Sequence, residues 1–166
     1  MEEDSIEREL RNWLRGARRI VIAGIGNPLR RDDYVGMRIV LDLMDVASQR
    51  VYLVGCETTP ESHSQEILEF KPTHILVIDA TSLGRPGGSI AFLEDLKSAP
   101  PPMTMHTLPL QILCGYLRST SGAKVALLAI QPQTIDFGEG LTREVENSAM
   151  AIVRTLRKIL SPKKKY

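Results

Sequence analysis

The chain has 166 residues, of which 43% are hydrophobic and 25% charged, values that fit one compact domain with an ordinary buried core. Its 21 Lys and Arg against 20 Asp and Glu leave a formal net charge of +1, so charge does not indicate nucleic acid or an acidic membrane as a partner. Cys56 and Cys114 lie far apart and in no Cys-x-x-Cys pair, which argues against a disulfide framework and a structural zinc cage.

The sequence shows neither a membrane span nor a signal peptide. The longest apolar runs, such as Ile20 to Ile25, have about six residues, whereas a membrane-spanning helix needs roughly 20. The first residues, Met1 to Asp4, are acidic where a signal peptide would be basic and then apolar. We therefore expect a cytoplasmic protein that does not insert into a membrane.

The N-terminal part predicts an amphipathic helix and then a buried strand. From about Ser5 to Arg18, apolar residues recur at i, i+4, i+7 and i+8, which is the spacing of one helical face. Arg19 to Gly24 is a β-branched apolar run typical of a strand covered on both sides. Gly24 to Asn27 forms a glycine turn, and helical spacing returns from Asp32. Strand, turn and helix make half of a βαβ unit.

The alternation of strands and helices continues to the end of the chain. Further strands are expected at 51–54, 74–79, 89–93 and 124–130, and further helices near 62–70, 108–118 and 142–160. Ser62 and Thr142 are expected to cap the helices that they precede. The turn from Gly84 to Gly88 indicates that the strand at 89–93 is an antiparallel edge strand.

This pattern predicts an α/β fold, a three-layer α/β/α sandwich around a mostly parallel five-stranded sheet with an antiparallel edge strand and an extra N-terminal helix. The expected organisation is an amphipathic helix at 1–18, a single α/β domain at 19–160 and a basic tail at 161–166.

Polar residues follow several of the predicted strands, and in such sheets sites form beyond the carboxyl ends of the strands. This edge is expected to gather Asn27, Asp32, Asp33, Glu57, Thr58, Asp79 and the loop residue His106. Two carboxylates and an imidazole suit nickel, zinc or manganese and leave positions open for water or substrate. Each residue also has a structural interpretation: the paired aspartates as partners of a helix dipole, Asp79 as a turn cap and His106 as a solvated loop histidine. His63 and His74 are interpreted as structural.

The glycine turn also permits a dinucleotide-binding interpretation, because Gly24-Ile25-Gly26 follows a strand and Glu57 ends the next one. However, Leu29 stands where a third glycine is needed, and Pro28 lacks an amide hydrogen. The following aspartates would meet the pyrophosphate, so anion binding there is disfavoured. The chain contains no Gly-x-Ser-x-Gly elbow, Walker loop or His-Glu-x-x-His motif.

The segment Gly24 to Gly36, with the sequence GIGNPLRRDDYVG, resembles the opening motif of the hydrogenase maturation proteases. These endopeptidases trim the C-terminal extension from the large-subunit precursor of [NiFe] hydrogenases. Further segments match this family in order and spacing, with most likeness to the hydrogenase-3-type branch: Thr59–Ser62, Lys71–Thr81, Pro86–Gly88, His106–Leu110 and Ile130–Pro132. The resemblance runs from about Arg19 to Leu160. Tyr34 and Cys56-Glu57 depart from the family pattern.

The resemblance implies that Asp33, Asp79 and His106 are both the catalytic residues and the nickel ligands. It implies that nickel arrives within the nickel-loaded large-subunit precursor, which is the expected partner, and that no cofactor is permanently bound. Either nickel or one of the aspartates acting as general base would activate water, the second route being that of an aspartic-type endopeptidase. A non-cleaving nickel-sensing adaptor and, with less support, a dinucleotide-binding oxidoreductase are the alternative hypotheses.

Overall fold

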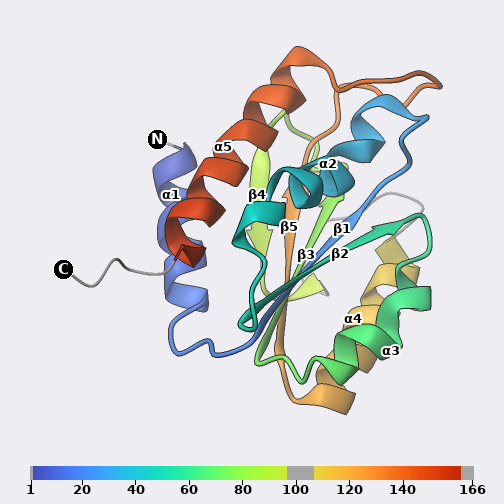
Figure 1. Cartoon of the computed structure of the whole chain (residues 1–166). Coiled ribbons are helices and arrows are strands. Elements are labelled where there is room, and N and C mark those ends of the chain that lie inside the picture. Colours follow the sequence, from blue (N-terminus) through green and yellow to red (C-terminus); the bar gives the residue numbers. More distant parts are fainter. Residues whose placement is uncertain (1, 97–106, 162–166) are drawn as a thin grey trace.

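The computed structural model describes residues 2–96 and 107–161, in which helices and strands alternate along the chain (Figure 1). The helices are α1 (Glu2–Trp13), α2 (Val35–Asp42), α3 (Ser64–Glu69), α4 (Thr107–Ser121) and α5 (Arg143–Leu160). The strands are β1 (Ile20–Ile25), β2 (Val51–Glu57), β3 (His74–Ala80), β4 (Ile90–Leu93) and β5 (Lys124–Ile130). Three short 3-10 helices in the described part are η1 (Arg31–Tyr34), η2 (Met44–Val46) and η3 (Pro60–His63).

The five strands form one sheet in the order β2-β1-β3-β5-β4. β1 runs parallel to β2 and β3, and β3 runs parallel to β5, whereas the edge strand β4 is antiparallel to β5. Every residue of β1 and β3 is buried, because these strands are covered on both faces. The predicted mostly parallel sheet with an antiparallel edge strand is confirmed.

The helices divide between the two faces of the sheet, so the predicted three-layer sandwich is also confirmed. α1, α2 and α5 cover one face, and α3 and α4 cover the other (Figure 1). Side chains of β1 alternate between the two cores, with Ile20 and Ile22 in the first and Val21 and Ala23 in the second, as the two-residue period of a strand requires. In the described part of the chain, no helix is both long and apolar enough to cross a membrane.

Helix α1 packs into the first core instead of standing apart from the sheet. Leu10 is fully buried, and Trp13 is 4% exposed. The Trp13 ring makes edge-on contacts with His74 at 5.0 Å and Phe92 at 5.6 Å between ring centroids. The Nε2 atom of His74 lies 3.0 Å from the Trp13 carbonyl oxygen, and burial lowers the pKa of this histidine. His74 therefore has the structural role expected from the sequence.

Of the two predicted helix caps, Ser62 is wrong, and Thr142 is confirmed in position but not as a side-chain cap. Ser62 lies within η3, and α3 begins only at Ser64, with His63 at the N-cap and no side-chain capping bond. Thr142 does occupy the N-cap of α5, but its side chain does not bond to the helix. A capping hydroxyl would accept a hydrogen bond from a backbone N–H of the first turn, whereas the hydroxyl group of Thr142 is directed toward the buried carboxylate of Asp32 and donates to it at 3.0 Å.

Candidate functional site

Close packing of backbone places η1 over the carboxyl ends of β1 and β3. A Cβ atom added to Gly24 would lie 2.1 Å from the carbonyl oxygen of Gly36, and one added to Gly36 would lie 2.2 Å from the carbonyl oxygen of Ile78. Only glycine permits these approaches, since real Cβ atoms do not come so close to other atoms. The start of α2 therefore sits directly on the two strands, and η1, which carries Asp32 and Asp33, lies beside the end of β3.

The structure brings Asp33 and Asp79 together at this edge of the sheet. Asp33 is 7% exposed, and its Oδ2 atom accepts a hydrogen bond of 3.0 Å from the backbone N–H of Asn27. Asp79 is 1% exposed. Burial, and then the negative charge of Asp33, raise the pKa of Asp79 well above its usual value, partly opposed by the backbone N–H of Ala80. Asp79 therefore holds a proton more readily than an exposed aspartate would.

The pair also carries an unsatisfied acceptor. Among the described residues, the buried side-chain nitrogen and oxygen atoms without a hydrogen-bond partner are Oδ1 of Asp79 and Nε of Arg31, and both lie on elements that meet at this edge. Because buried polar atoms nearly always have a partner, an open carboxylate oxygen beside a second carboxylate favours a ligand that brings positive charge. A proton or a divalent cation would meet this need.

His106, the third predicted ligand, lies outside the described residues. Within the described ranges, no group of three or more His, Cys, Asp or Glu side chains is arranged to hold a metal ion. The two aspartates are thus the part of the predicted ligand set that the structure places, and the role of His106 stays a prediction.

Asp32 does not join the pair, although the sequence placed it with the candidate residues at the same edge. Its side chain is fully buried, and both oxygen atoms are already used. Oδ2 accepts from the backbone N–H groups of Gln133 at 2.8 Å and Thr134 at 3.1 Å. Oδ1 accepts from the backbone N–H of Thr142 at 2.7 Å and from its hydroxyl at 3.0 Å. Asp32 anchors the segment that follows β5 and has no free acceptor for a ligand.

The segment at 131–142 is joined to η1 by backbone bonds as well. The N–H of Arg31 donates to the carbonyl of Gly138 at 3.0 Å, and the N–H of Gly138 donates to the carbonyl of Leu29 at 2.8 Å. At the start of the segment, Oε1 of Gln131 accepts from the backbone N–H of Leu83 at 2.5 Å and so fixes the turn after Asp79. Sequence reasoning missed these links, since no local pattern joins residues so far apart in the chain.

The remaining candidates at this edge have structural roles. The side-chain oxygen of Asn27 accepts from the backbone N–H of Leu29 at 2.9 Å, and the N–H of Gly26 donates to the carbonyl of Glu57 at 2.8 Å. The side chain of Glu57 is exposed, and Thr58 lines a neighbouring cavity. The amide hydrogens of the glycine turn are thus used within the protein, which argues against the binding of a dinucleotide pyrophosphate there.

Comparison with known proteins agrees with this geometry. A family model described as hydrogenase maturation protease matches residues 35–159. The chain belongs to the hydrogenase maturation protease family. It is 34% identical over 155 residues to a protein of Methanocaldococcus jannaschii with the provisional name hydrogenase maturation protease, covering 89% of this chain and 91% of that one. It is 26% identical to the hydrogenase 3 maturation protease of Escherichia coli K12, covering 82% and 87%.

Solved structures of this protease family share the fold. The crystal structure of the [NiFe] hydrogenase maturation protease HycI from Thermococcus kodakarensis has a TM-score of 0.86 and 28% identity, covering 93% of this chain and 99% of that one. The solution structure of the endopeptidase HycI from Escherichia coli has a TM-score of 0.72 and 25% identity, with coverage of 82% and 87%. The resemblance to this family expected from the sequence is therefore confirmed, and the protein is a peptidase of hydrogenase maturation.

Proposed function

We propose that this protease removes the C-terminal extension of a [NiFe] hydrogenase large-subunit precursor after nickel has been inserted, and that it recognises the nickel of the precursor through Asp33, Asp79 and His106. The observation that carries the proposal is the buried carboxylate pair with an open oxygen on Asp79. Two carboxylates that lie together in a buried place favour a positively charged ligand, such as a metal ion carried by a substrate.

The chemistry of the ligands favours nickel that is carried in by the substrate and not held by the free enzyme. Two carboxylates and one imidazole lack the thiolates or additional histidines that hold a transition metal tightly. Cysteine thiolates of the precursor would supply the stronger ligands. When the precursor docks, the positive charge of its nickel favours the ionised form of Asp79, whose pKa is otherwise raised by burial and by the negative charge of Asp33.

The hydrolytic step needs a group that accepts a proton from water. Asp33 is more exposed than Asp79, and its hydrogen bond from the N–H of Asn27 orients the carboxylate. One carboxylate of the pair takes the proton as water adds to the scissile carbonyl, and the leaving amine is protonated when the C–N bond breaks. The precursor's nickel supplies Lewis-acid chemistry, by polarising that carbonyl or lowering the pKa of the water.

The proposal is tested by incubating the protein with nickel-loaded and nickel-free precursor and following cleavage by mass spectrometry. Asp33→Asn, Asp79→Asn and His106→Ala are compared with wild type and with Asp45→Asn, which replaces an exposed aspartate paired with Arg157. We expect cleavage of the nickel-loaded precursor alone, by wild type and Asp45→Asn. Equal cleavage of nickel-free precursor, or full activity of Asp79→Asn, contradicts the proposal. Binding of the loaded precursor without any cleavage would instead identify a nickel-sensing adaptor.

A further inference from the structure

Helix α4 carries two apolar stripes: one is buried in the core, and the other is largely exposed, although its Leu113 packs partly against the core. The first consists of Leu110, Cys114 and Leu117, which are all buried. The second has the i, i+3, i+4, i+7 spacing of a helical face and consists of Pro109, Ile112, Leu113 and Tyr116. On this second stripe Ile112 is 66% exposed and Tyr116 is 50% exposed. Large apolar side chains gathered on one helical face indicate a binding surface more than scattered ones do.

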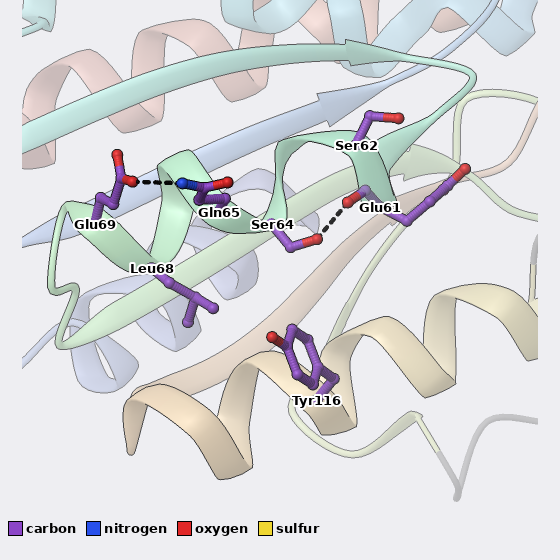
Figure 2. Close-up of a pocket in the computed structure, with 7 residues that line it drawn as sticks. All are labelled: Glu61, Ser62, Ser64, Gln65, Leu68, Glu69 and Tyr116. Carbon is purple, nitrogen blue, oxygen red and sulfur yellow. Dashed lines mark hydrogen bonds between the residues drawn. The ribbon is translucent and has the colours of Figure 1, made fainter.

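The second stripe forms one wall of a groove, and α3 with η3 forms the other. Figure 2 shows Leu68 of α3 and Tyr116 of α4 pointing into the space between the two helices. This part of the groove has a volume of about 620 Å³. An adjoining part of about 440 Å³ is lined by Ile112 and Leu113, and a smaller part of about 270 Å³ reaches Ile25 and Thr58. Glu61 lines all three parts, so they form one groove, named here the α3–α4 groove.

The α3–α4 groove ends beside the carboxylate pair. Ile25 is the last residue of β1, and two residues later the N–H of Asn27 donates to Asp33. From Pro109 to Tyr116 the helix rises about 10 Å, which matches about three residues of extended peptide. A peptide chain that passes the Asp33 and Asp79 edge can therefore continue into the groove without leaving the protein surface.

The α3–α4 groove is lined by acidic side chains and is therefore negatively charged. Glu61 is exposed, and among the described residues no Lys or Arg lines the groove. Glu69, at the far end of α3, accepts a hydrogen bond of 2.9 Å from the side chain of Gln65. An occupant with apolar side chains for the α4 stripe and a Lys or Arg for Glu61 would complement both features.

We propose that the α3–α4 groove binds the C-terminal extension of the precursor, as a single peptide strand with apolar and basic side chains, during cleavage. This inference rests on the proposed function. The part of the precursor before the scissile bond is folded and carries the nickel, and it is too wide for a groove between two helices. The part after the scissile bond is the extension, a chain end that can enter the groove. Continuity with the cleavage edge favours the extension over a second copy of this protein.

The test uses a fluorescein-labelled synthetic peptide with the sequence of the extension, taken from the large-subunit precursor of the same organism. Fluorescence anisotropy measures its affinity for the full-length protein. Ile112→Glu places a charge on the apolar stripe and is expected to weaken binding about tenfold or more. The matched control is Leu41→Glu, which adds the same charge at a residue that is 50% exposed on α2, a helix on the other face of the sheet. Thermal unfolding confirms that both variants are folded.

A second variant tests the acidic wall separately. Glu61→Gln is expected to weaken binding about twofold to fivefold, the range of an exposed ion pair, and to reduce the dependence of affinity on salt. Equal peptide affinity in wild type, Ile112→Glu and Leu41→Glu overturns the proposal. So does a change from dimer to monomer in Ile112→Glu with unchanged peptide affinity, which would identify the stripe as a contact between copies.

Cleavage assays distinguish this inference from the proposed function. Ile112→Glu should raise the KM for nickel-loaded precursor about tenfold while kcat changes little, because it removes binding and not chemistry. It should have no effect on a precursor shortened to two residues after the scissile bond. If wild type cleaves the precursor and Ile112→Glu does so with an unchanged KM, the groove proposal fails and the proposed function stands. If wild type binds the peptide but cleaves no precursor, the proposed function fails.

Discussion

Asp32 and Asp33 are neighbours of the same residue type, yet the structure predicts that replacement by Asn strongly lowers stability at Asp32 and leaves it nearly unchanged at Asp33. Asp32 is fully buried and accepts hydrogen bonds from three backbone N–H groups and one hydroxyl. In Asp32→Asn, an NH₂ group replaces one oxygen and faces donors that it cannot bond. Two donors then lose their acceptor, and each charge-assisted bond contributes about 1.5–3 kcal/mol. The expected loss in the free energy of unfolding is about 3–6 kcal/mol.

Asp33→Asn should leave stability nearly unchanged. The remaining oxygen can still accept from the N–H of Asn27, and removal of the charge ends the repulsion with Asp79. We expect a change in the free energy of unfolding within about 1 kcal/mol of zero, or a small gain. Cleavage of nickel-loaded precursor should nevertheless be lost, because the proposed site needs both carboxylates.

Thermal and urea unfolding at pH 7 measure the stability of both variants, with Glu57→Gln as an exposed control at the same edge. A loss of several kcal/mol in a chain of this size lowers Tm by roughly 10 °C or more. The reasoning is refuted if Asp32→Asn unfolds within about 1 kcal/mol of wild type. It is also refuted if Asp33→Asn is destabilised as much as Asp32→Asn, since the two side chains would then share one structural role.

Three further predictions concern the pH dependence, the N-terminal helix and the metal content. Because the pKa of Asp79 is raised in the folded state, the wild-type protein loses stability as pH rises from the unfolded-state pKa toward the folded-state pKa. Asp79→Asn should lack this loss, so the free energy of unfolding of the variant minus that of wild type, measured with urea, should be larger at pH 8 than at pH 5. An equal difference at both pH values would contradict a raised pKa for Asp79. Leu10→Ala should cost about 2–5 kcal/mol, whereas Met150→Ala, at a residue 49% exposed, should cost little; equal costs in urea unfolding would show that α1 is not part of the core. Elemental analysis of the purified protein should find no stoichiometric metal, and one tightly held zinc ion per chain would contradict nickel delivery by the substrate.

The sheet could be predicted from the sequence because its signals are local. Strands covered on both faces read as continuous apolar runs, and Ile20–Ile25 and His74–Ala80 have this character along their whole length. The turn before Ile90–Leu93 marks the change of direction that makes β4 antiparallel. The predicted N-terminal helix also formed, although it ends at Trp13 and not near residue 18, because amphipathic spacing locates a helix better than it locates its end.

The separate roles of Asp32 and Asp33 could not be predicted, because the partners that decide them are remote. Asp32 is 101 residues from Gln133 and 110 residues from Thr142 along the chain. Thr142 occupies the predicted N-cap position, but its hydroxyl group donates to the carboxylate of Asp32, which only the folded chain brings near. Asp33 and Asp79, in contrast, were predictable as a pair, because parallel strands end at one edge of a sheet.

The arrangement around Asp79 connects stability with the proposed function. An unsatisfied buried carboxylate beside a second carboxylate lowers the stability of the protein. The fold tolerates this loss because the surrounding backbone is fixed by close packing at Gly24 and Gly36 and by the four hydrogen bonds to Asp32. In the proposed function, a cation at the pair would relieve this unfavourable interaction, and the protein would bind a cation-bearing precursor more tightly than the same precursor without the cation. The proposed discrimination between nickel-loaded and nickel-free precursor would then follow from the electrostatics of the two aspartates, with no need for a conformational change.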